Sequence, residues 1–211
     1  MALPDGVVGV LLAGGKSSRM GGGDKCLRMI GGRAILARVI DRLRPQVSDI
    51  AINANEDPDR FAAFGLPVVA DSIAGYAGPL AGVHAGLEWV TANRPGVEHV
   101  VTVATDTPFF PEDLVARLRA ASDDRSALRI AKSEVGMHYV IGLWPVALAD
   151  VLKASLERGD RRVGAWVKEH KAVEVNFPPG HVGGRMIDPF FNINAPEDLA
   201  MAEALLSESA S

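Results

Sequence analysis

A glycine-rich segment with basic side chains is the part of the chain best suited to bind an anion. It covers residues 12–25 and reads Leu-Ala-Gly-Gly-Lys-Ser-Ser-Arg-Met-Gly-Gly-Gly-Asp-Lys. Glycine lets backbone N–H groups approach an anion closely, and Lys16, Arg19 and Lys25 can neutralise phosphate charge. Residues 13–28 hold four basic side chains against one acidic side chain, a local charge of +3 in a chain whose net charge is −4. The segment predicts a polyphosphate site, and a flexible surface loop with solvated charges is the alternative.

Two common phosphate-binding loops do not fit this segment. A Rossmann fingerprint needs G-x-G-x-x-G leading directly into a helix, and the glycines here have a different spacing. A P-loop needs G-x-x-x-x-G-K-[ST], and Gly15-Lys16-Ser17 supplies its end. Its first glycine would then fall at Val10, inside a predicted strand. Both motifs are therefore excluded by position.

An aspartate follows the second clearly buried strand of the sequence. Residues 99–104 read His-Val-Val-Thr-Val-Ala, and Asp106 comes two positions later. Ligands of an open α/β sheet bind at the carboxyl ends of its strands, so Asp106 is expected at the ligand edge. Mg²⁺ is commonly bound by one or two carboxylates and substrate phosphates, which makes Asp106 a candidate metal ligand. The alternative is a turn or cap aspartate before Thr107 and Pro108.

The elements that must position these residues alternate between strand and helix. Short apolar runs typical of buried parallel strands are separated by segments of helical periodicity. In the first 120 residues the predicted strands cover 7–12, 49–53, 66–70 and 99–104, and the predicted helices cover 35–43, 82–93 and 112–118. Pro111 is expected at the first position of the last of these helices. The alternation predicts an α/β fold, a single three-layer αβα domain over residues 1–211 with a Rossmann-like, mostly parallel sheet.

The second half of the sequence has a less regular pattern. Its predicted strands cover 128–131, 139–143 and 172–177, and its predicted helices cover 147–156, 163–170 and 196–206. Residues 178–184, rich in Gly and Pro, are expected to form a loop. No internal repeat or linker indicates a boundary between domains.

Composition limits the classes of partner. The chain has 211 residues, 48% of them hydrophobic and 23% charged, which is typical of a globular protein. A net charge of −4 argues against nucleic-acid polymers and anionic membranes as partners, but not against a small phosphorylated ligand. Cys26, the one cysteine, excludes an intramolecular disulfide. The first six residues do not resemble a signal peptide, and no apolar run approaches about 18 residues. We therefore expect a cytoplasmic protein.

The glycine-rich segment and four further motifs together resemble the molybdenum cofactor guanylyltransferases. The segment matches the signature L-A-G-G-x-S-x-R-M-G-x-x-K of pyrophosphorylase-type nucleotidyltransferases with one position spare, and Asp24 precedes Lys25. The other matching motifs are Asn53-Ala54-Asn55, Asp71-Ser72 with Gly78-Pro79-Leu80-Ala81-Gly82, Asp106-Thr107-Pro108, and Asn192-Ile193-Asn194-Ala195-Pro196-Glu197-Asp198. The resemblance implies a GT-A-like nucleotidyltransferase fold. It also implies a nucleotide-binding half over about 1–120 and a second-substrate half over about 121–211.

The resemblance implies a reaction together with its substrates and cofactor. The terminal phosphate of molybdopterin, or of the molybdenum cofactor, attacks the α-phosphate of GTP, which releases pyrophosphate and forms the guanine dinucleotide. The expected cofactor is Mg²⁺, with Mn²⁺ as a substitute. Transient contacts with molybdenum-insertion and cofactor-chaperone proteins are also expected. Because the nucleophile is already an anion, positioning and charge neutralisation must carry most of the catalysis.

The matched positions imply roles for individual residues. Lys25 binds the GTP phosphates, Arg19 stabilises charge near the α-phosphate or the leaving group, and Asp106 is the metal ligand. The implied GTP-binding residues are Leu12, Ala13, Gly14, Gly15, Lys25, Asn53, Asp71 and Asp106. The implied residues of the cleft or of the second-substrate site are Pro79, Leu80, Gly82, Asn192 and Asn194.

Several of these residues have a structural alternative. Guanine presents N1–H and an amino group, which a carboxylate at Asp71 can accept, but Asp71 could also cap a helix. Asn53 could form a local turn instead of binding a nucleotide. Asn194 with Glu197 also matches a variant of the helix capping box. His138 fits a strand interior and is assigned no role.

Three alternative functions remain open from the sequence. A sister cytidylyltransferase or a small sugar-phosphate nucleotidyltransferase would share the glycine-rich segment and Asp106. A nucleotide-binding regulatory module would belong to a different class, and the presence of Arg19, Lys25 and Asp106 argues against it. The basic residues Arg158, Arg161, Arg162 and Lys168 could meet a pterin phosphate or form a solvated surface.

Overall fold

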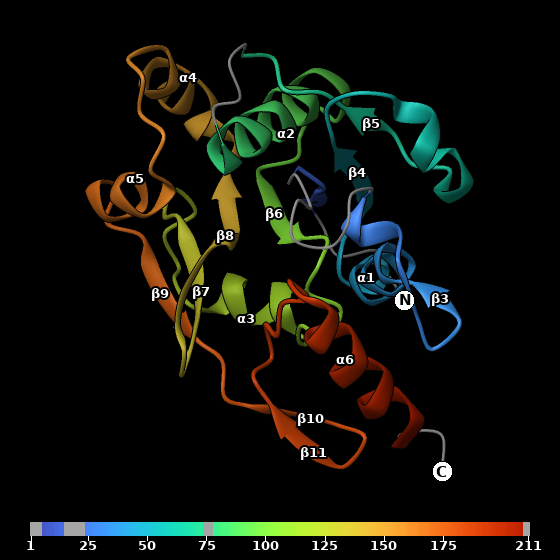
Figure 1. Ribbon diagram of the computed structural model, residues 1–211. Coiled ribbons are helices and arrows are strands. Elements are labelled where there is room, and N and C mark those ends of the chain that lie inside the picture. The colour runs from blue at the N-terminus through green and yellow to red at the C-terminus, as the bar shows by residue number, and fades with distance from the viewer. Residues whose placement is uncertain (1–5, 15–23, 74–77, 209–211) are drawn as a thin grey trace.

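The computed structural model describes residues 6–14, 24–73 and 78–208, and a mixed seven-stranded sheet forms the centre of this part of the chain (Figure 1). The strand order is β5-β4-β1-β6-β8-β7-β9. β8 runs antiparallel to both of its neighbours, and the other pairs in this sheet are parallel. The prediction of a mostly parallel sheet is confirmed.

The bounds of the elements are as follows. The strands of the large sheet are β1 (Val7–Leu12), β4 (Asp49–Asn53), β5 (Val68–Val69), β6 (His99–Ala104), β7 (Arg129–Ser133), β8 (Gly136–Pro145) and β9 (Val173–Asn176). Two hairpins pair β2 (Met29–Ile30) with β3 (Arg33–Ala34) and β10 (Gly180–Val182) with β11 (Arg185–Ile187). The α-helices are α1 (Ile35–Leu43), α2 (Pro79–Asn93), α3 (Leu114–Ala120), α4 (Ala149–Glu157), α5 (Val163–Glu169) and α6 (Pro196–Glu208). Short 3-10 segments cover Lys25–Leu27, Arg44–Gln46, Pro58–Phe64 and Val146–Leu148.

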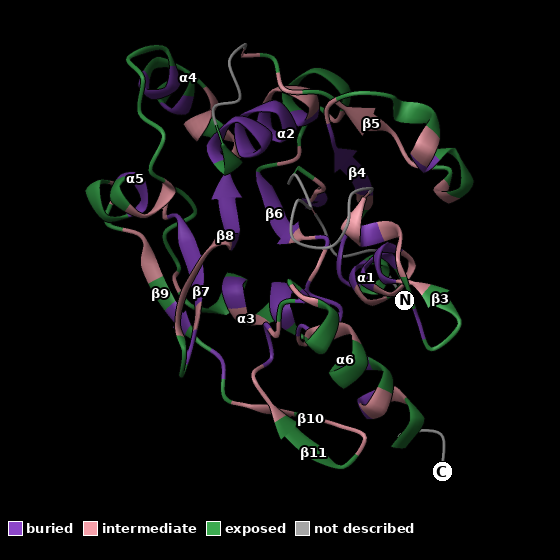
Figure 2. Ribbon diagram, in the orientation of Figure 1, coloured by how far each residue is buried: buried purple, intermediate pink, exposed green. Residues whose placement is uncertain are grey.

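Both faces of the large sheet are covered, which makes the fold a three-layer α/β arrangement. Alternate residues of β1 point to opposite faces, as strand geometry requires. Val7 and Leu11 join the core formed with α1 and α3, whereas Val8 and Val10 join the core formed with α2, α4 and α5. Strand β6 is buried along nearly its whole length in Figure 2, and β1 has the same burial pattern. Burial on both faces explains why these strands read as continuous apolar runs.

Helix α2 lies unusually close to the sheet because it presents two glycines to it. Gly82 and Gly86 are one turn apart on the same side of the helix. A Cβ atom at Gly86 would lie 2.8 Å from a methyl carbon of Val10, and one at Gly82 would lie 2.2 Å from Oδ1 of Asn53. Larger residues at these two positions would push the first half of α2 away from the ends of β1 and β4.

A third apolar cluster lies at the end of the molecule where Figure 1 shows α6 beside the β10–β11 hairpin. It joins Ile30 and Ile35 to Ile193 and to Leu205 of α6. The prediction of a loop over residues 178–184 is wrong, since the first half of this hairpin forms there. Among the described residues, no helix combines the length and the apolar character needed to cross a membrane.

One predicted helix begins later than expected. Pro111 does not take the first helical position, because α3 begins at Leu114 and residues before it form turns. The backbone N–H of Leu114 donates to the carbonyl of Pro111 at 3.2 Å. The side chain of Gln46 also accepts a hydrogen bond from the N–H of Val115 at 3.0 Å, so a distant residue satisfies the first turn.

Candidate functional site

Lys25 is surrounded by oxygen atoms from two distant parts of the chain. Its Nζ atom lies 2.5 Å from Oδ2 of Asp106, which follows β6. It also donates to Oδ1 of Asn194 at 2.7 Å and, more weakly, to Oδ1 of Asn192 at 3.5 Å. The side chains of Lys25 and Asp106 are each 18% exposed. We call Lys25, Asp106, Asn192 and Asn194 the lysine cluster.

The segment before α6 is fixed next to Asp106 by backbone contacts. The N–H of Ile193 donates to the carbonyl of Asp106 at 2.9 Å, and the side chain of Ile193 is fully buried. Asn192 and Asn194 lie on either side of Ile193 in the sequence, and this anchor holds both of them near Lys25. The cap of α6 comes from Asp198, whose Oδ2 accepts the N–H groups of Asn194 and Ala195 at 2.8 Å each.

The expected capping partner of Asn194 was Glu197, and the structure corrects this. The carboxylate that reaches back is that of Asp198, the next residue. The side chain of Asn194 takes no part in this cap in the contacts described, because its Oδ1 accepts from Lys25. The cap of α6 therefore uses backbone N–H groups of this segment, whereas the lysine cluster uses the side chain of Asn194.

A second group of polar residues, which we call the aspartate cluster, lies at the carboxyl ends of β4 and β5. Asn53 Nδ2 donates to Oδ1 of Asp71 at 2.9 Å, and Asn55 Nδ2 donates to Oδ2 of Asp71 at 2.9 Å. Oδ1 of Asn55 accepts the N–H of Asp71 at 2.9 Å. These bonds join separate strands, so Asn53 does not form a local turn and Asp71 is held from both sides. The two amides hold the carboxylate of Asp71 in a fixed orientation.

The end of β1 lies between the two clusters. The N–H of Ala13 donates to the carbonyl of Asn53 at 2.9 Å, and the N–H of Thr105 lies 3.4 Å from the carbonyl of Leu12. Leu12 also contacts α2, because a Cβ atom at Gly82 would lie 3.1 Å from its Cδ2 atom. The start of the glycine-rich segment is thus fixed by β4 on one side and by the residues after β6 on the other.

The remaining predicted site residues are placed as follows. Gly14 is exposed at the end of the described part of the segment. Gly15 and Arg19 lie outside the described residues. Pro79 opens α2, and the side chain of Leu80 is fully buried in the core, so only its backbone can face a substrate.

Arg60 joins the aspartate cluster to Asp24, and its role was not identified from the sequence. Its Nη1 atom lies 3.1 Å from Oδ1 of Asp24, the neighbour of Lys25, and its Nη2 atom donates to the carbonyl of Asn55 at 2.5 Å. Asn55 belonged to a recognised motif but was given no role. Arg60 lies in a 3-10 segment without a motif, so only the folded chain reveals its position.

Cys26 follows Lys25 but is unsuited to act as a nucleophile. Its side chain is buried, and burial together with the nearby Asp24 raises the pKa of its thiol to about 11. A thiol with such a pKa is protonated at neutral pH, and the thiolate is the reactive form. Cys26 therefore serves packing in this site.

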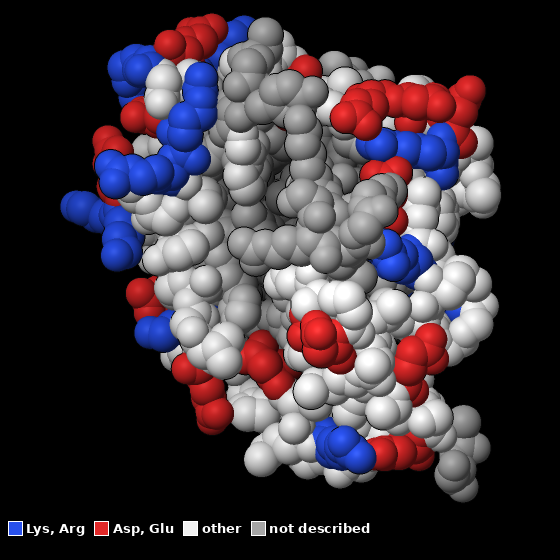
Figure 3. Space-filling view, in the orientation of Figure 1, with Lys and Arg blue, Asp and Glu red and all other residues white. Residues whose placement is uncertain are grey.

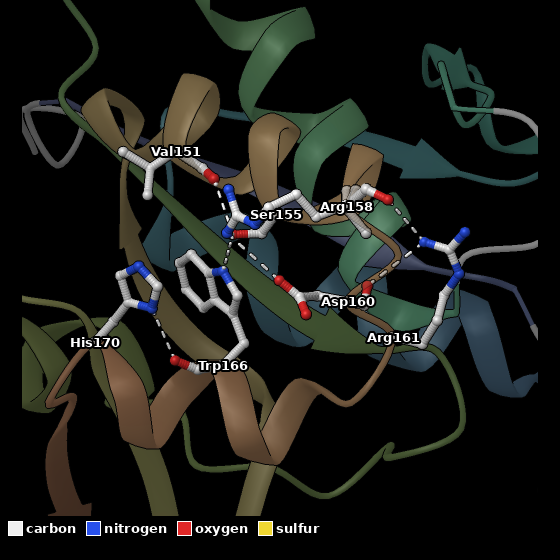
Figure 4. A network of polar contacts seen from close by, with 8 residues as sticks. Val151, Ser155, Arg158, Asp160, Arg161, Trp166 and His170 are labelled. Carbon is white, nitrogen blue, oxygen red and sulfur yellow. Dashed lines mark hydrogen bonds and ion pairs between the residues drawn. The ribbon is translucent and has the colours of Figure 1, made fainter.

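The basic residues near α4 and α5 are engaged in structural contacts. Figure 3 shows Lys and Arg side chains gathered over these helices, interspersed with acidic ones. Arg158 donates to Oγ of Ser155 at 3.1 Å, and Arg161 donates to the carbonyl of Leu156 at 3.0 Å. In Figure 4 Ser155 also receives the indole N–H of Trp166, at 3.0 Å. This network joins α4 to α5 and gives the two arginines a role without a phosphate.

The parts of the site lie along the sheet edge in the order of the strands that they follow. From one side of the sheet to the other, the aspartate cluster follows β5 and β4, the glycine-rich segment follows β1, and Asp106 follows β6. Along the chain, β4 and β5 are added on one side of β1, and β6 is then added on its other side. The topological switch point therefore lies between β1 and β6. Ligands of open α/β sheets bind outside such a point.

Comparisons with known proteins agree with this geometry. Residues 9–173 match the family model described as the MobA-like NTP transferase domain. The chain is 51% identical over 201 residues to the molybdenum cofactor guanylyltransferase of Bradyrhizobium sp. (strain ORS 278), which covers 94% of this chain and 92% of that protein. It is 49% identical over 199 residues to the protein of the same name from Nitrobacter hamburgensis, with 93% of each chain covered.

A solved structure has the same fold. The molybdopterin-guanine dinucleotide biosynthesis protein A of Archaeoglobus fulgidus aligns with a TM-score of 0.69 and 19% identity, over 95% of this chain and 99% of that one. At this identity the likeness concerns the fold. The family assignment depends instead on the matched domain and on the curated relatives, and by both measures this chain belongs to the MobA-like NTP transferase family.

Proposed function

We propose that this chain transfers GMP from GTP to the terminal phosphate of molybdopterin or the molybdenum cofactor, which forms the guanine dinucleotide and releases pyrophosphate. The observation that carries the proposal is the position of the lysine cluster, between the aspartate cluster and the antiparallel strand β8, with Lys25 as the last residue of the glycine-rich segment. This order offers a place for a base, a polyphosphate and a second substrate along one edge. Curated relatives that share about half of the residues bear the corresponding name.

The proposed reaction makes one bond and breaks one bond. An oxygen of the pterin phosphate bonds to the α-phosphorus of GTP, and the bond from that phosphorus to the bridging oxygen breaks. Pyrophosphate leaves with the electron pair. The attacking oxygen is already anionic, so the protein needs no strong base and must instead align the two phosphates and offset their charge.

Lys25 is the described residue best placed to offset phosphate charge. Its ammonium group is held by Asp106 at 2.5 Å and by Asn194 at 2.7 Å. A polyphosphate on the adjoining glycine-rich segment would compete with these oxygens for the same cation. Arg19, in the same segment, remains the predicted partner for charge on the α-phosphate or the leaving group.

The oxygen atoms of the lysine cluster fit a magnesium ion. A carboxylate and two amide oxygens converge on one cation, the ammonium of Lys25, and hard oxygen atoms of this kind are the ligands that Mg²⁺ takes. Asp106 would hold the ion, with substrate phosphates and water as further ligands. When bound, such an ion neutralises phosphate charge during transfer.

Guanine recognition is proposed at Asp71. Guanine presents an N–H and an amino group side by side, and a carboxylate can accept from both, whereas cytosine presents a different pattern. Each oxygen of Asp71 already accepts one amide and keeps further acceptor capacity. The pocket would therefore favour GTP over CTP.

The deciding experiment is molybdopterin-dependent release of pyrophosphate, measured with GTP, CTP, ATP and UTP in turn and with Mg²⁺ present or chelated. We expect release with GTP, little release with the other nucleotides, and loss of release on chelation. Equal or faster release with CTP would overturn the guanine assignment. Release from GTP that does not depend on added molybdopterin would overturn the second substrate.

Contacts with insertion and chaperone proteins stay a prediction.

A further inference from the structure

A cavity of about 310 Å³ opens beside the lysine cluster, on the side away from Asp71. Asn192 lines both the cavity and the lysine cluster. Thr107, the neighbour of Asp106, lines it as well. The volume lies at the lower end of the range of small-molecule sites, about 300 to 1,000 Å³. A ligand in this cavity would have one end next to Asp106.

The walls of the cavity are apolar and aromatic. Val140 and Ile141 of β8 form one part of the lining, and Phe190 and Phe191 form another. Phe190 is packed in place, because its ring contacts the rings of His138 and Phe177 at centroid distances of 4.5 and 5.2 Å. Such walls suit a flat ring system.

Three polar residues meet at this cavity, and none was given a role from the sequence. Oγ of Ser133 donates to Oδ2 of Asp188 at 2.5 Å and lies 2.8 Å from Nε2 of His138. Oδ1 of Asp188 accepts the N–H of Phe190 at 2.8 Å. The three come from β7, from β8 and from the segment after β11, and His138 and Asp188 line the cavity.

The directions of these hydrogen bonds assign the proton positions. The hydroxyl of Ser133 has one proton, which it gives to Asp188, so His138 must donate from Nε2 to the hydroxyl oxygen. Nε2 of His138 lies 4.0 Å from Oδ1 of Asp188, too far for a hydrogen bond. In a Ser-His-Asp relay the aspartate accepts a hydrogen bond from the histidine, and the histidine accepts the proton of the serine. Neither bond is made here, so this arrangement is not a hydrolytic triad. It orients Asp188 as an acceptor.

We propose that this cavity binds the pterin ring of the second substrate and that Asp188 recognises its aminopyrimidinone edge. This inference rests on the proposed function. A pterin carries an N–H beside an amino group, and a carboxylate can accept from both while the aromatic walls cover the ring faces. With the ring in this cavity, the phosphate end of the substrate points to Asp106.

Guanine has the same edge, so the same chemistry has two possible sources. The position of the cavity favours the pterin. Asp188 and Asp71 lie on opposite sides of Asp106 along the sheet edge, and the nucleotide side is the one that adjoins the glycine-rich segment and the aspartate cluster. One carboxylate is therefore available for each ring.

The test compares two free ring probes on the intact protein. Pterin and lumazine differ in that lumazine has an oxygen in place of the amino group. Calorimetric titration of the wild-type protein should show pterin bound about tenfold more tightly than lumazine, because a hydrogen bond to a charged group is lost with lumazine. Asp188→Asn should remove this preference and leave the KM for GTP unchanged. Asp41→Asn, a change to an exposed carboxylate on α1, is the matched control and should change neither.

Each other outcome overturns the proposal. An undiminished preference for pterin in Asp188→Asn would exclude Asp188 as the recognising group, and a raised KM for GTP would assign it to the nucleotide instead. Absence of pterin binding to the wild-type protein would exclude the cavity. If Asp188→Asn does not fold by circular dichroism, Phe191→Leu decides, since it keeps apolar volume and removes an aromatic wall. It should weaken both probes about equally, and unchanged binding of both would overturn the proposal.

The proposed function can fail separately. A wild-type protein that binds pterin selectively but releases no pyrophosphate from GTP and molybdopterin would contradict the transfer reaction and leave the cavity assignment standing. Normal transfer together with unselective probe binding would contradict only the cavity assignment.

Discussion

The ammonium group of Lys25 contacts the carboxylate of Asp106 at 2.5 Å, in a site where each side chain is 18% exposed. The candidate metal ligand therefore neutralises the charge of the candidate phosphate-binding cation. Binding of a polyphosphate and a metal cation would replace the Lys25–Asp106 pair by two pairs, one between Lys25 and the phosphates and one between Asp106 and the metal ion. Each of the two residues would then contact a ligand in place of the other residue.

Replacement of Asp106 should slow catalysis strongly and leave the fold intact. Asp106→Asn keeps the shape and removes the charge that would hold the metal ion, so kcat/KM for pyrophosphate release should fall by roughly 10²–10³. The thermal unfolding temperature should change little because the ion pair is partly exposed. Asp41→Asn serves as the control, and near-normal release by Asp106→Asn would exclude Asp106 as the metal ligand.

Asn55 should matter for nucleotide binding although its role was not apparent in the sequence. It exchanges two hydrogen bonds of 2.9 Å with Asp71. Asn55→Ala should raise the KM for GTP by about fivefold to 150-fold, as expected for about 1–3 kcal/mol, with a smaller change in kcat. Asn93→Ala, which removes an exposed amide bonded to the carbonyl of Trp89, should have no effect on KM. Equal KM values for the two variants would contradict the positioning of Asp71 by Asn55.

A methyl group at Gly82, on α2, should disturb the aspartate cluster through Asn53. The added carbon would lie 2.2 Å from Oδ1 of Asn53, so either α2 or Asn53 must move. We expect Gly82→Ala to lower the free energy of urea unfolding by about 1–3 kcal/mol and to weaken GTP binding. Gly180→Ala, which has open space around the new carbon, is the matched control. Unchanged GTP affinity in a folded Gly82→Ala protein would show that the contact is not transmitted to the site.

Acid should destabilise the folded chain through its buried histidines. Burial lowers the pKa of His84, His99 and His138 below the ordinary value of 6.5. The unfolded chain then binds protons first as the pH falls, so the stabilisation is complete above about pH 6.5 and is lost as the pH falls through the lower folded pKa values. The unfolding temperature should drop between about pH 7.5 and 5.5. His99→Gln should reduce this dependence, the exposed His181→Gln should not, and a flat or rising profile in the wild-type protein would be inconsistent with the shifts.

The sequence was sufficient to predict the strands that form the centre of the sheet. β1 and β6 are buried on both faces, so their apolar runs stand out, and the residues that follow them fall at the ligand edge by topology alone. The β10–β11 hairpin was missed because its Gly and Pro content is typical of a loop, and its pairing is supported by contact with α6.

The cavity site could not be predicted for a different reason. Ser133, His138 and Asp188 carry no local motif, and they meet because β7 pairs with β8 and because Ile193 fixes the segment after β11 beside Asp106. Such long-range pairings are not encoded in any short window of sequence. The same holds for Arg60, whose partners Asp24 and Asn55 lie on different elements.

The order of the strands along the sheet edge has a consequence for the product of the proposed reaction. The proposed guanine position follows β5 and the proposed pterin position lies beside β8. Four strand spacings, about 19 Å, separate these two strands. A dinucleotide joined through its diphosphate would occupy both positions with one molecule and would behave as a bivalent ligand. When one end leaves its site, the bound end keeps it nearby at a high effective concentration, so it can rebind the same site. The product would therefore dissociate more slowly than either ring system bound alone.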